Sequence, residues 1–279
     1  MATIANELTA PRAPTTPAAL GAVATLARRR FALTARTPRE LIVPLLTPVL
    51  FALIIAPALK EALHTSSLYE SFVATGTIGL LIPLNTMFAG LGAVVDREAG
   101  AQRELLTAPI SRALLPIGNL IVAFSVTALQ VAVLLAVATL RGIDFHIDGA
   151  RVLWFVAGSA LFAVGMYGIA EALAARVPRP EEYIARVPAI AIVPWFLAGS
   201  LFPISALPIG LEWITRFLPL THALALVRYG LLGDSSGLQH IWRMSSVGEM
   251  ATLSLAAVGL FAAVALFGGI RAFRRSAVQ

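Results

Sequence analysis

Cysteine is absent from the chain, and lysine occurs once, at Lys60. The lack of cysteine excludes disulfides, thiolate catalysis and cysteine-ligated metal sites. Charged residues are also scarce, at 13% of the 279 residues against about 25% in soluble proteins, whereas 58% are hydrophobic. A soluble domain of this length needs more polar surface, so the composition predicts an integral membrane protein. The net charge of +6 fits membrane topology, and we expect no nucleic-acid partner.

Sequence motifs for catalysis and nucleotide binding are missing as well. The chain contains no Gly-x-x-x-x-Gly-Lys-Ser/Thr phosphate loop, no Gly-x-Ser-x-Gly elbow and no His-Glu-x-x-His pair. Asp144, His146 and Asp148 lie close together, but a zinc site needs ligands that converge from several segments. We therefore expect no catalytic residue, no metal and no cofactor in this chain, and any ATP and Mg²⁺ to be bound by a partner.

Long apolar runs predict an all-α fold with six transmembrane helices. The expected spans are residues 41–59, 72–95, 113–140, 152–175, 183–202 and 247–270. The expected divisions are a disordered tail at 1–17, an interfacial amphipathic helix at 18–37, a six-span domain at 38–275 and a tail at 276–279.

The connection between the fifth and sixth expected spans has a different character. Residues 207–218 and 220–232 are apolar pieces too short to cross a bilayer. We expect short re-entrant helices there, beginning near Pro208 and Pro219, because proline is compatible with the first turn of a helix. An exposed turn is expected over residues 233–237.

Basic residues are distributed unevenly between the two sides of the expected spans. Fifteen of the 21 Lys and Arg residues lie near the two termini or in the 96–112 and 176–186 loops. The positive-inside rule then predicts that both termini and these loops are cytoplasmic. We interpret the chain as a multi-pass protein of the bacterial inner membrane, in contact with its lipids.

Three polar positions inside the expected spans have two interpretations each. Asn85 and Gln130 either line a substrate path or form hydrogen bonds between helices. Glu171 lies about one turn from the cytoplasmic end of the fourth span, where it either pairs with an arginine such as Arg176 or relays protons.

Residues 96–112 form a charged segment between two long apolar runs, and we expect a helix of about four turns on one membrane face. A soluble partner that binds this helix could move both flanking spans. The residues expected to make this coupling contact are Asp96, Arg97, Glu98, Gly100, Arg103 and Glu104.

Two stretches of the sequence resemble the permease subunits of type-2 ABC exporters, the group of the daunorubicin-resistance and nodulation lipo-oligosaccharide permeases. The first stretch contains Asp96-Arg97-Glu98, Gly100, Glu104-Leu105-Leu106 and Pro109-Ile110-Ser111-Arg112. The second stretch contains residues 196–203, Leu207-Pro208, residues 218–222 and Arg228.

This resemblance implies two permease chains, identical or paralogous, that carry two ABC ATP-binding subunits. It implies that the N-terminal helix and the 96–112 loop contact the ATPase, with Arg179, Glu181 and Glu182 in a second contact loop. We expect the permease subunit of an ATP-driven exporter of hydrophobic or amphiphilic cargo (drug, lipid or lipid-linked glycan), because the spans hold few charges. The alternatives are an ion-driven carrier that uses Glu171 and a membrane enzyme that uses His146 and His222.

Overall fold

The computed structural model describes residues 21, 24–29, 31–32, 46, 49–64, 67–100, 114–146 and 148–276. All regular secondary structure in these residues is helical, which confirms the all-α fold class. The elements are η1 (Phe51–Ile55), α3 (Ala56–Ala62), α4 (Ser67–Glu98), α6 (Leu114–Leu140), α7 (Val152–Ala174), α8 (Pro180–Leu197), η2 (Ile204–Ala206), α9 (Ile209–Arg216), α10 (Pro219–Leu232), α11 (Ser236–Trp242) and α12 (Val247–Ser276).

Four of the described helices, α4, α6, α7 and α12, are long and apolar enough to cross a membrane. They match four of the six predicted spans, and the count of six is not confirmed. The predicted span at 183–202 corresponds to α8, which has 18 residues and carries Glu181, Glu182 and Arg186 near its beginning. This helix ends at Leu197 because Gly199 follows with a φ of +80°, which right-handed helix does not allow.

The predicted first span, residues 41–59, lies largely outside the described residues. From Phe51 the chain forms one π-helical turn, η1, and then α3, which continues to Ala62 with Pro57 in its first turn. The predicted tail at 1–17 and most of the interfacial helix at 18–37 also lie outside, although residues 24–29, 31 and 32 are helical.

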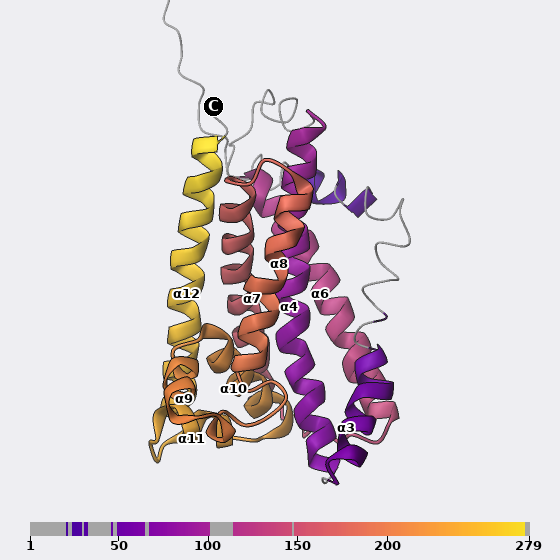
Figure 1. The fold of residues 1–279 in the computed structure, drawn as a ribbon, viewed down its shortest axis with the longest axis vertical. Coiled ribbons are helices and arrows are strands. Elements are labelled where there is room, and N and C mark those ends of the chain that lie inside the picture. The colour runs from indigo at the N-terminus through magenta and orange to yellow at the C-terminus, as the bar shows by residue number, and fades with distance from the viewer. Residues whose placement is uncertain are drawn as a thin grey trace, which may run out of the picture.

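Helix α7 contacts α4, α10 and α12, so it lies in the middle of the bundle (Figure 1). Backbone atoms of both helices take part in its contact with α12. A Cβ atom added to Gly269 would lie 2.4 Å from the carbonyl oxygen of Gly168. A Cβ atom added to Gly165 would lie 2.3 Å from the ring of Phe261. Small residues at such a crossing allow two helices to approach at backbone distance.

The short helices α9, α10 and α11 gather at the end of the bundle opposite the C-terminus (Figure 1). Helices α9 and α10 agree with the two predicted short pieces, and α10 is mostly buried. The exposed turn predicted over 233–237 is wrong at its end, since Ser236 begins α11 and Leu238 and Ile241 bury their side chains. Gly233, with a φ of +71°, terminates α10.

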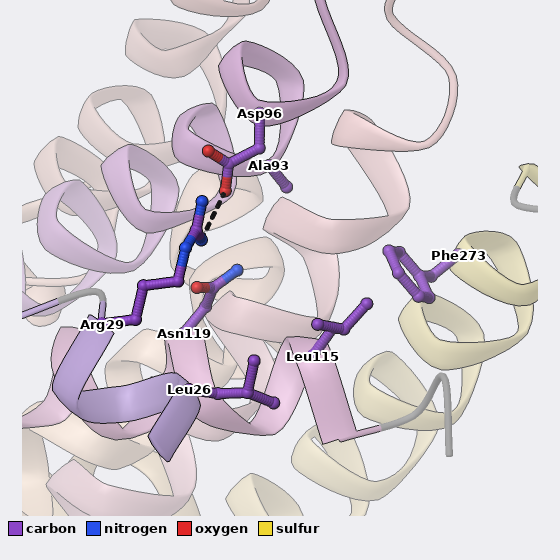
Figure 2. Close-up of a pocket in the computed structure, with 7 residues that line it drawn as sticks. All are labelled: Leu26, Arg29, Ala93, Asp96, Leu115, Asn119 and Phe273. Carbon is purple, nitrogen blue, oxygen red and sulfur yellow. Dashed lines mark ion pairs between the residues drawn. The ribbon is translucent and has the colours of Figure 1, made fainter. Parts of the chain in front are cut away.

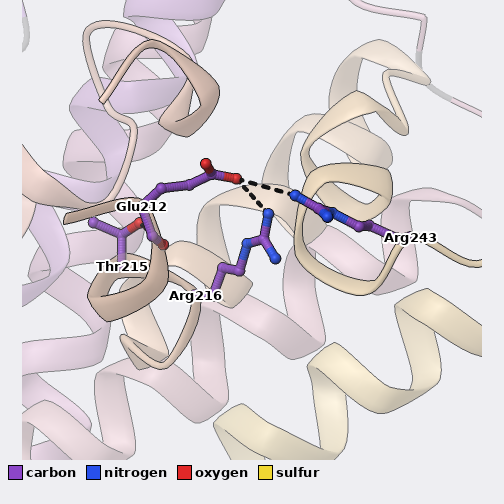
Figure 3. A network of polar contacts seen from close by, with 4 residues as sticks. All are labelled: Glu212, Thr215, Arg216 and Arg243. Atoms are coloured by element: carbon purple, nitrogen blue, oxygen red, sulfur yellow. Dashed lines mark hydrogen bonds and ion pairs between the residues drawn. The ribbon is translucent and has the colours of Figure 1, made fainter. Parts of the chain in front are cut away.

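Helix α9 is connected to the end of α11 by a charged network (Figure 3). The carboxylate of Glu212 accepts a hydrogen bond from Arg216, one turn later on α9, and lies 3.6 Å from the guanidinium of Arg243. Thr215 donates to the carbonyl oxygen of Glu212. The network therefore fixes α9 against the segment that leads into α12.

Segments from distant parts of the sequence meet at each end of the bundle. At one end, Arg29 forms an ion pair with Asp96, and Phe273 of α12 lines the same small cavity. At the other end, the Tyr69 hydroxyl donates to the carbonyl oxygen of Leu201 at 2.9 Å. The described parts of the arginine-rich segments thus share one end, and the short helices lie at the other.

Candidate functional site

The carboxyl end of α4 contains the first half of the predicted coupling segment. Asp96, Arg97 and Glu98 form the last turn of α4, and the chain turns at Ala99 and Gly100. A single helix over residues 96–112 is therefore wrong at its beginning, because Gly100, with a φ of +77°, ends α4 in the left-handed conformation that glycine favours. The predicted residues Arg103 and Glu104 lie outside the described residues.

Arg97 joins the end of α4 to the end of α7. Its Nη1 donates to the carbonyl oxygen of Ala174 at 2.8 Å, and its Nη2 donates to the carbonyl oxygen of Val177. Ala174 is the last residue of α7, where carbonyl groups have no partner within the helix. The guanidinium therefore caps α7 and connects the two predicted coupling loops within one chain.

Asp96 connects α4 to the N-terminal helical segment. Its carboxylate lies 3.9 Å from a guanidinium nitrogen of Arg29, and both side chains face a shared cavity (Figure 2). The cavity has a volume of about 30 Å³, enough for about one water molecule, and Asn119 of α6 also lines it. Glu98, by contrast, is exposed.

The second predicted coupling loop leads into α8. Arg179, the residue before the helix, and Glu181 and Glu182 in its first turn are all exposed. Glu182 forms an ion pair with Arg186 at 3.8 Å, and both side chains are about half exposed. These charges therefore face away from the bundle, on the end where α4 terminates.

Tyr183 holds this exposed turn to the bundle, and sequence reasoning missed it. The side chain is fully buried, and its hydroxyl donates to the carbonyl oxygen of Met87 at 2.8 Å. The hydroxyl also lies 3.4 Å from the carbonyl oxygen of Ala170, and Gly90 leaves room for it. The four-residue spacing between Tyr183 and the buried Val187 was the available signal for a packed face.

Asn85 and Gln130, the two predicted substrate-path residues, contact each other. Asn85 Nδ2 donates to Gln130 Oε1 at 2.7 Å, which joins α4 to α6. Gln130 is buried, and its Nε2 has no hydrogen-bond partner among the described residues. The interhelical hydrogen bond considered from the sequence is therefore present, and the substrate-path role stays a prediction.

Glu171, on which the ion-driven alternative depends, is buried at the end of α7. Its carboxylate accepts a hydrogen bond from the Tyr167 hydroxyl one turn earlier. The expected partner Arg176 instead donates to the carbonyl oxygen of Ala172 at 2.8 Å.

The two histidines of the enzyme alternative differ in their surroundings. His222 on α10 packs against the Trp242 ring, and its Nδ1 lies 3.3 Å from the Ser254 hydroxyl. Burial lowers the pKa of His222, so the ring is neutral at pH 7. His146 is exposed in the loop after α6. In the part of the chain that the structure describes, no three His, Asp or Glu residues are placed to hold a metal.

Comparison with known proteins gave one family and several relatives. The family model described as ABC-2 type transporter matches residues 21–232. The ycf38 protein of Porphyra purpurea, which is named as a transport permease, is 26% identical over 211 residues, or 73% of this chain and 72% of that protein. The linearmycin resistance permease protein LnrN of Bacillus subtilis is 29% identical over 216 residues.

The LnrN alignment covers 77% of this chain and 51% of LnrN, so the chain spans about half of that relative. Nodulation protein J of Rhizobium leguminosarum is 26% identical over 171 residues, which is 60% of this chain and 64% of that protein. The family match over residues 21–232 includes both stretches on which the sequence resemblance depends.

Proposed function

Because this chain belongs to the ABC-2 type transporter family, we propose that it is the membrane subunit of an ATP-driven exporter. Its relatives are named as transport permeases, and four helices are suited to crossing a membrane. The sequence contains no phosphate loop, so the ATP and Mg²⁺ would be bound by an ABC ATP-binding subunit. Two such subunits would serve a pair of permease chains.

The contact made by Arg97 is the observation that carries this proposal. It joins the end of α4, where Glu98 is exposed, to the chain after α7, where Arg179, Glu181 and Glu182 are exposed. An ATPase subunit that presses on either loop would move α4 and α7 together, because the guanidinium joins their ends.

The end of the bundle that holds these loops would face the cytoplasm of a bacterial cell, with both termini on that side. The arginine distribution supports this orientation. Arg29 at Asp96 would add the N-terminal helix to the same ATPase contact.

The proposed cargo is hydrophobic or amphiphilic. Two observations support it: buried charged side chains are few among the described spans, and the LnrN relative is named for resistance to linearmycin. An apolar cavity of about 120 Å³ lies between α4, α7, α8 and α10, lined in part by Pro83, Phe162 and Pro194. Cargo would cross along the interface of the two permease chains, with Asn85 and Gln130 as candidate path residues.

The test is a charge reversal at the exposed end of α4. Glu98→Arg should weaken co-purification of the ABC ATP-binding subunit and permease-dependent ATP hydrolysis at least tenfold, because like charges at an interface cost several kcal/mol. Glu249→Arg is the matched control, since this exposed carboxylate lies in the first turn of α12 at the other end. Full ATPase stimulation by the Glu98→Arg chain would refute the coupling contact.

A further inference from the structure

Arg228 of α10 is a buried charge that is 5% exposed. It belongs to none of the ion pairs of the described residues, although the charge of Asp234 acts on it across the adjacent cavity. Its guanidinium lies 3.5 Å from the centroid of the Phe72 ring. Burial lowers the pKa of Arg228 to about 9, an effect that Asp234 opposes, so the group keeps its charge at neutral pH.

Backbone carbonyl groups use only part of this guanidinium. Nη2 donates to the carbonyl oxygens of Gly199 at 2.8 Å and Ser200 at 3.2 Å, and it lies 3.4 Å from that of Phe72. Nε donates to the Thr75 hydroxyl at 3.4 Å. Among the described residues none of these bonds involves Nη1, which keeps two N–H donors. Neutral acceptors solvate a buried cation but supply no negative charge.

A cavity of about 180 Å³ lies beside Arg228, with room for roughly six water molecules. Thr221 and Arg228 both line it, and they lie seven residues apart, so they occupy one face of α10. The Thr221 side chain is 4% exposed, and its hydroxyl has no hydrogen-bond partner among the described residues. Arg228 and Thr221, whose hydroxyl group is buried and unpaired among the described residues, therefore line the same wall of the cavity.

Polar side chains lie on another wall of the cavity. Asp234, Ser236 and His240 line it there, and Asp234 Oδ1 accepts a hydrogen bond from the backbone N–H of Ser236 at 2.9 Å. The Asp234 carboxylate thus already accepts a hydrogen bond from its own loop, and its negative charge disfavours a ligand with two negative charges. The combination favours an anion with one negative charge.

We propose that this cavity is a binding site for a singly charged oxyanion, a phosphate or phosphodiester group, held by Arg228 Nη1 and the Thr221 hydroxyl. The group could come from free inorganic phosphate or from a phospholipid headgroup, since Phe72 and Ile204 supply apolar walls beside the charge. The site lies at the end of the bundle opposite the proposed ATPase contact, and its occupation does not depend on that contact.

The experiment measures thermal unfolding of the purified full chain in nonionic detergent, without any ATPase subunit. One series adds potassium phosphate, another adds dihexanoyl phosphatidylglycerol, and a third adds potassium chloride at equal ionic strength. Ligand that binds the folded state raises the unfolding midpoint with concentration. We expect phosphate or the phosphodiester lipid, but not chloride, to raise the midpoint, and the active series identifies the source of the group.

The variant is Thr221→Val, which keeps the shape of the side chain and removes the hydroxyl group. It should fold, because the hydroxyl makes no bond in the described structure, and it should bind the oxyanion about tenfold more weakly. Thr77→Val is the matched control, a buried threonine of α4 whose hydroxyl donates to Val73 and which does not line the cavity. A wild-type chain that responds to neither oxyanion, or a Thr221→Val chain that responds as wild type does, overturns the proposal.

Discussion

The contact between α7 and α12 predicts that two neighbouring glycines of α12, Gly268 and Gly269, differ in their tolerance of alanine. Gly269 faces the backbone of Gly168, whereas a Cβ atom at Gly268 would meet nothing within 4 Å. An alanine at 269 would place its Cβ atom 2.4 Å from the carbonyl oxygen of Gly168, roughly 1 Å closer than van der Waals contact allows. Backbone atoms of α7 cannot move aside, so the two helices must separate.

The magnitude follows from comparing Gly269→Ala with Gly268→Ala. Both changes gain the same helix propensity, about 1 kcal/mol, so this gain cancels in the difference. Overpacking of a close contact costs about 1–3 kcal/mol, and this is the expected difference in unfolding free energy between the two variants. For a protein of this size each kcal/mol lowers the unfolding midpoint by about 2–4 °C.

The assay is thermal unfolding of both variants in the same detergent, followed by circular dichroism. We expect Gly268→Ala to unfold at or above the wild-type temperature and Gly269→Ala to unfold below it. Equal midpoints for the two variants would show that α7 and α12 do not meet at backbone distance, and the packing described here would be wrong.

Two further predictions concern contacts between the helices. Arg97→Gln should remove both guanidinium bonds to the end of α7 and destabilise the chain by about 2–4 kcal/mol, and Arg97→Lys should recover part of the loss. If the proposed function holds, Arg97→Gln should also uncouple ATP hydrolysis by the partner subunit from transport, and full coupling in this variant would contradict the role given to the contact. Asn85→Leu should lower the unfolding free energy by about 1–3 kcal/mol because the Gln130 amide is left unpaired, whereas Gln130→Leu should stay within about 1 kcal/mol of wild type. Equal losses in chemical unfolding would contradict the contact. A Gln130→Leu chain of normal stability that transports poorly would support the substrate path.

Hydropathy predicted the long helices well, because a bilayer requires long apolar runs. Residues 152–175 became α7 with its end moved by one residue, and residues 113–140 became α6. Hydropathy did not predict the ends of a helix that continues past its apolar run, as α4 does through Glu98. The 32 residues of α4 reach about 48 Å, which exceeds a bilayer core of about 30 Å, so its ends are polar. Helix α11 was missed because seven residues with two buried side chains resemble a loop in sequence.

Candidate coupling residues could be proposed from the sequence, but not the contacts that they make within the chain. Arg97 was expected to face an ATPase, and the structure shows that it binds carbonyl groups 77 and 80 residues later in its own chain. Such partners depend on tertiary structure, which no local pattern records. A lone arginine in the apolar run of α10 was a usable signal for Arg228, since a charge there must be compensated.

The arginine bound to the segment after α8 also bears on how the chain is made. Gly199 precedes Arg228 by 29 residues, so the ribosome completes α8 and the segment after it before the group that binds the carbonyl oxygens of that segment. Until α10 arrives, those oxygens have no guanidinium partner, and releasing α8 and this segment alone into hydrocarbon would cost several kcal/mol for each unpaired group. We therefore expect the insertion machinery to retain α8 until α10 has been synthesised, and to deliver the intervening hairpin to the lipid as one unit.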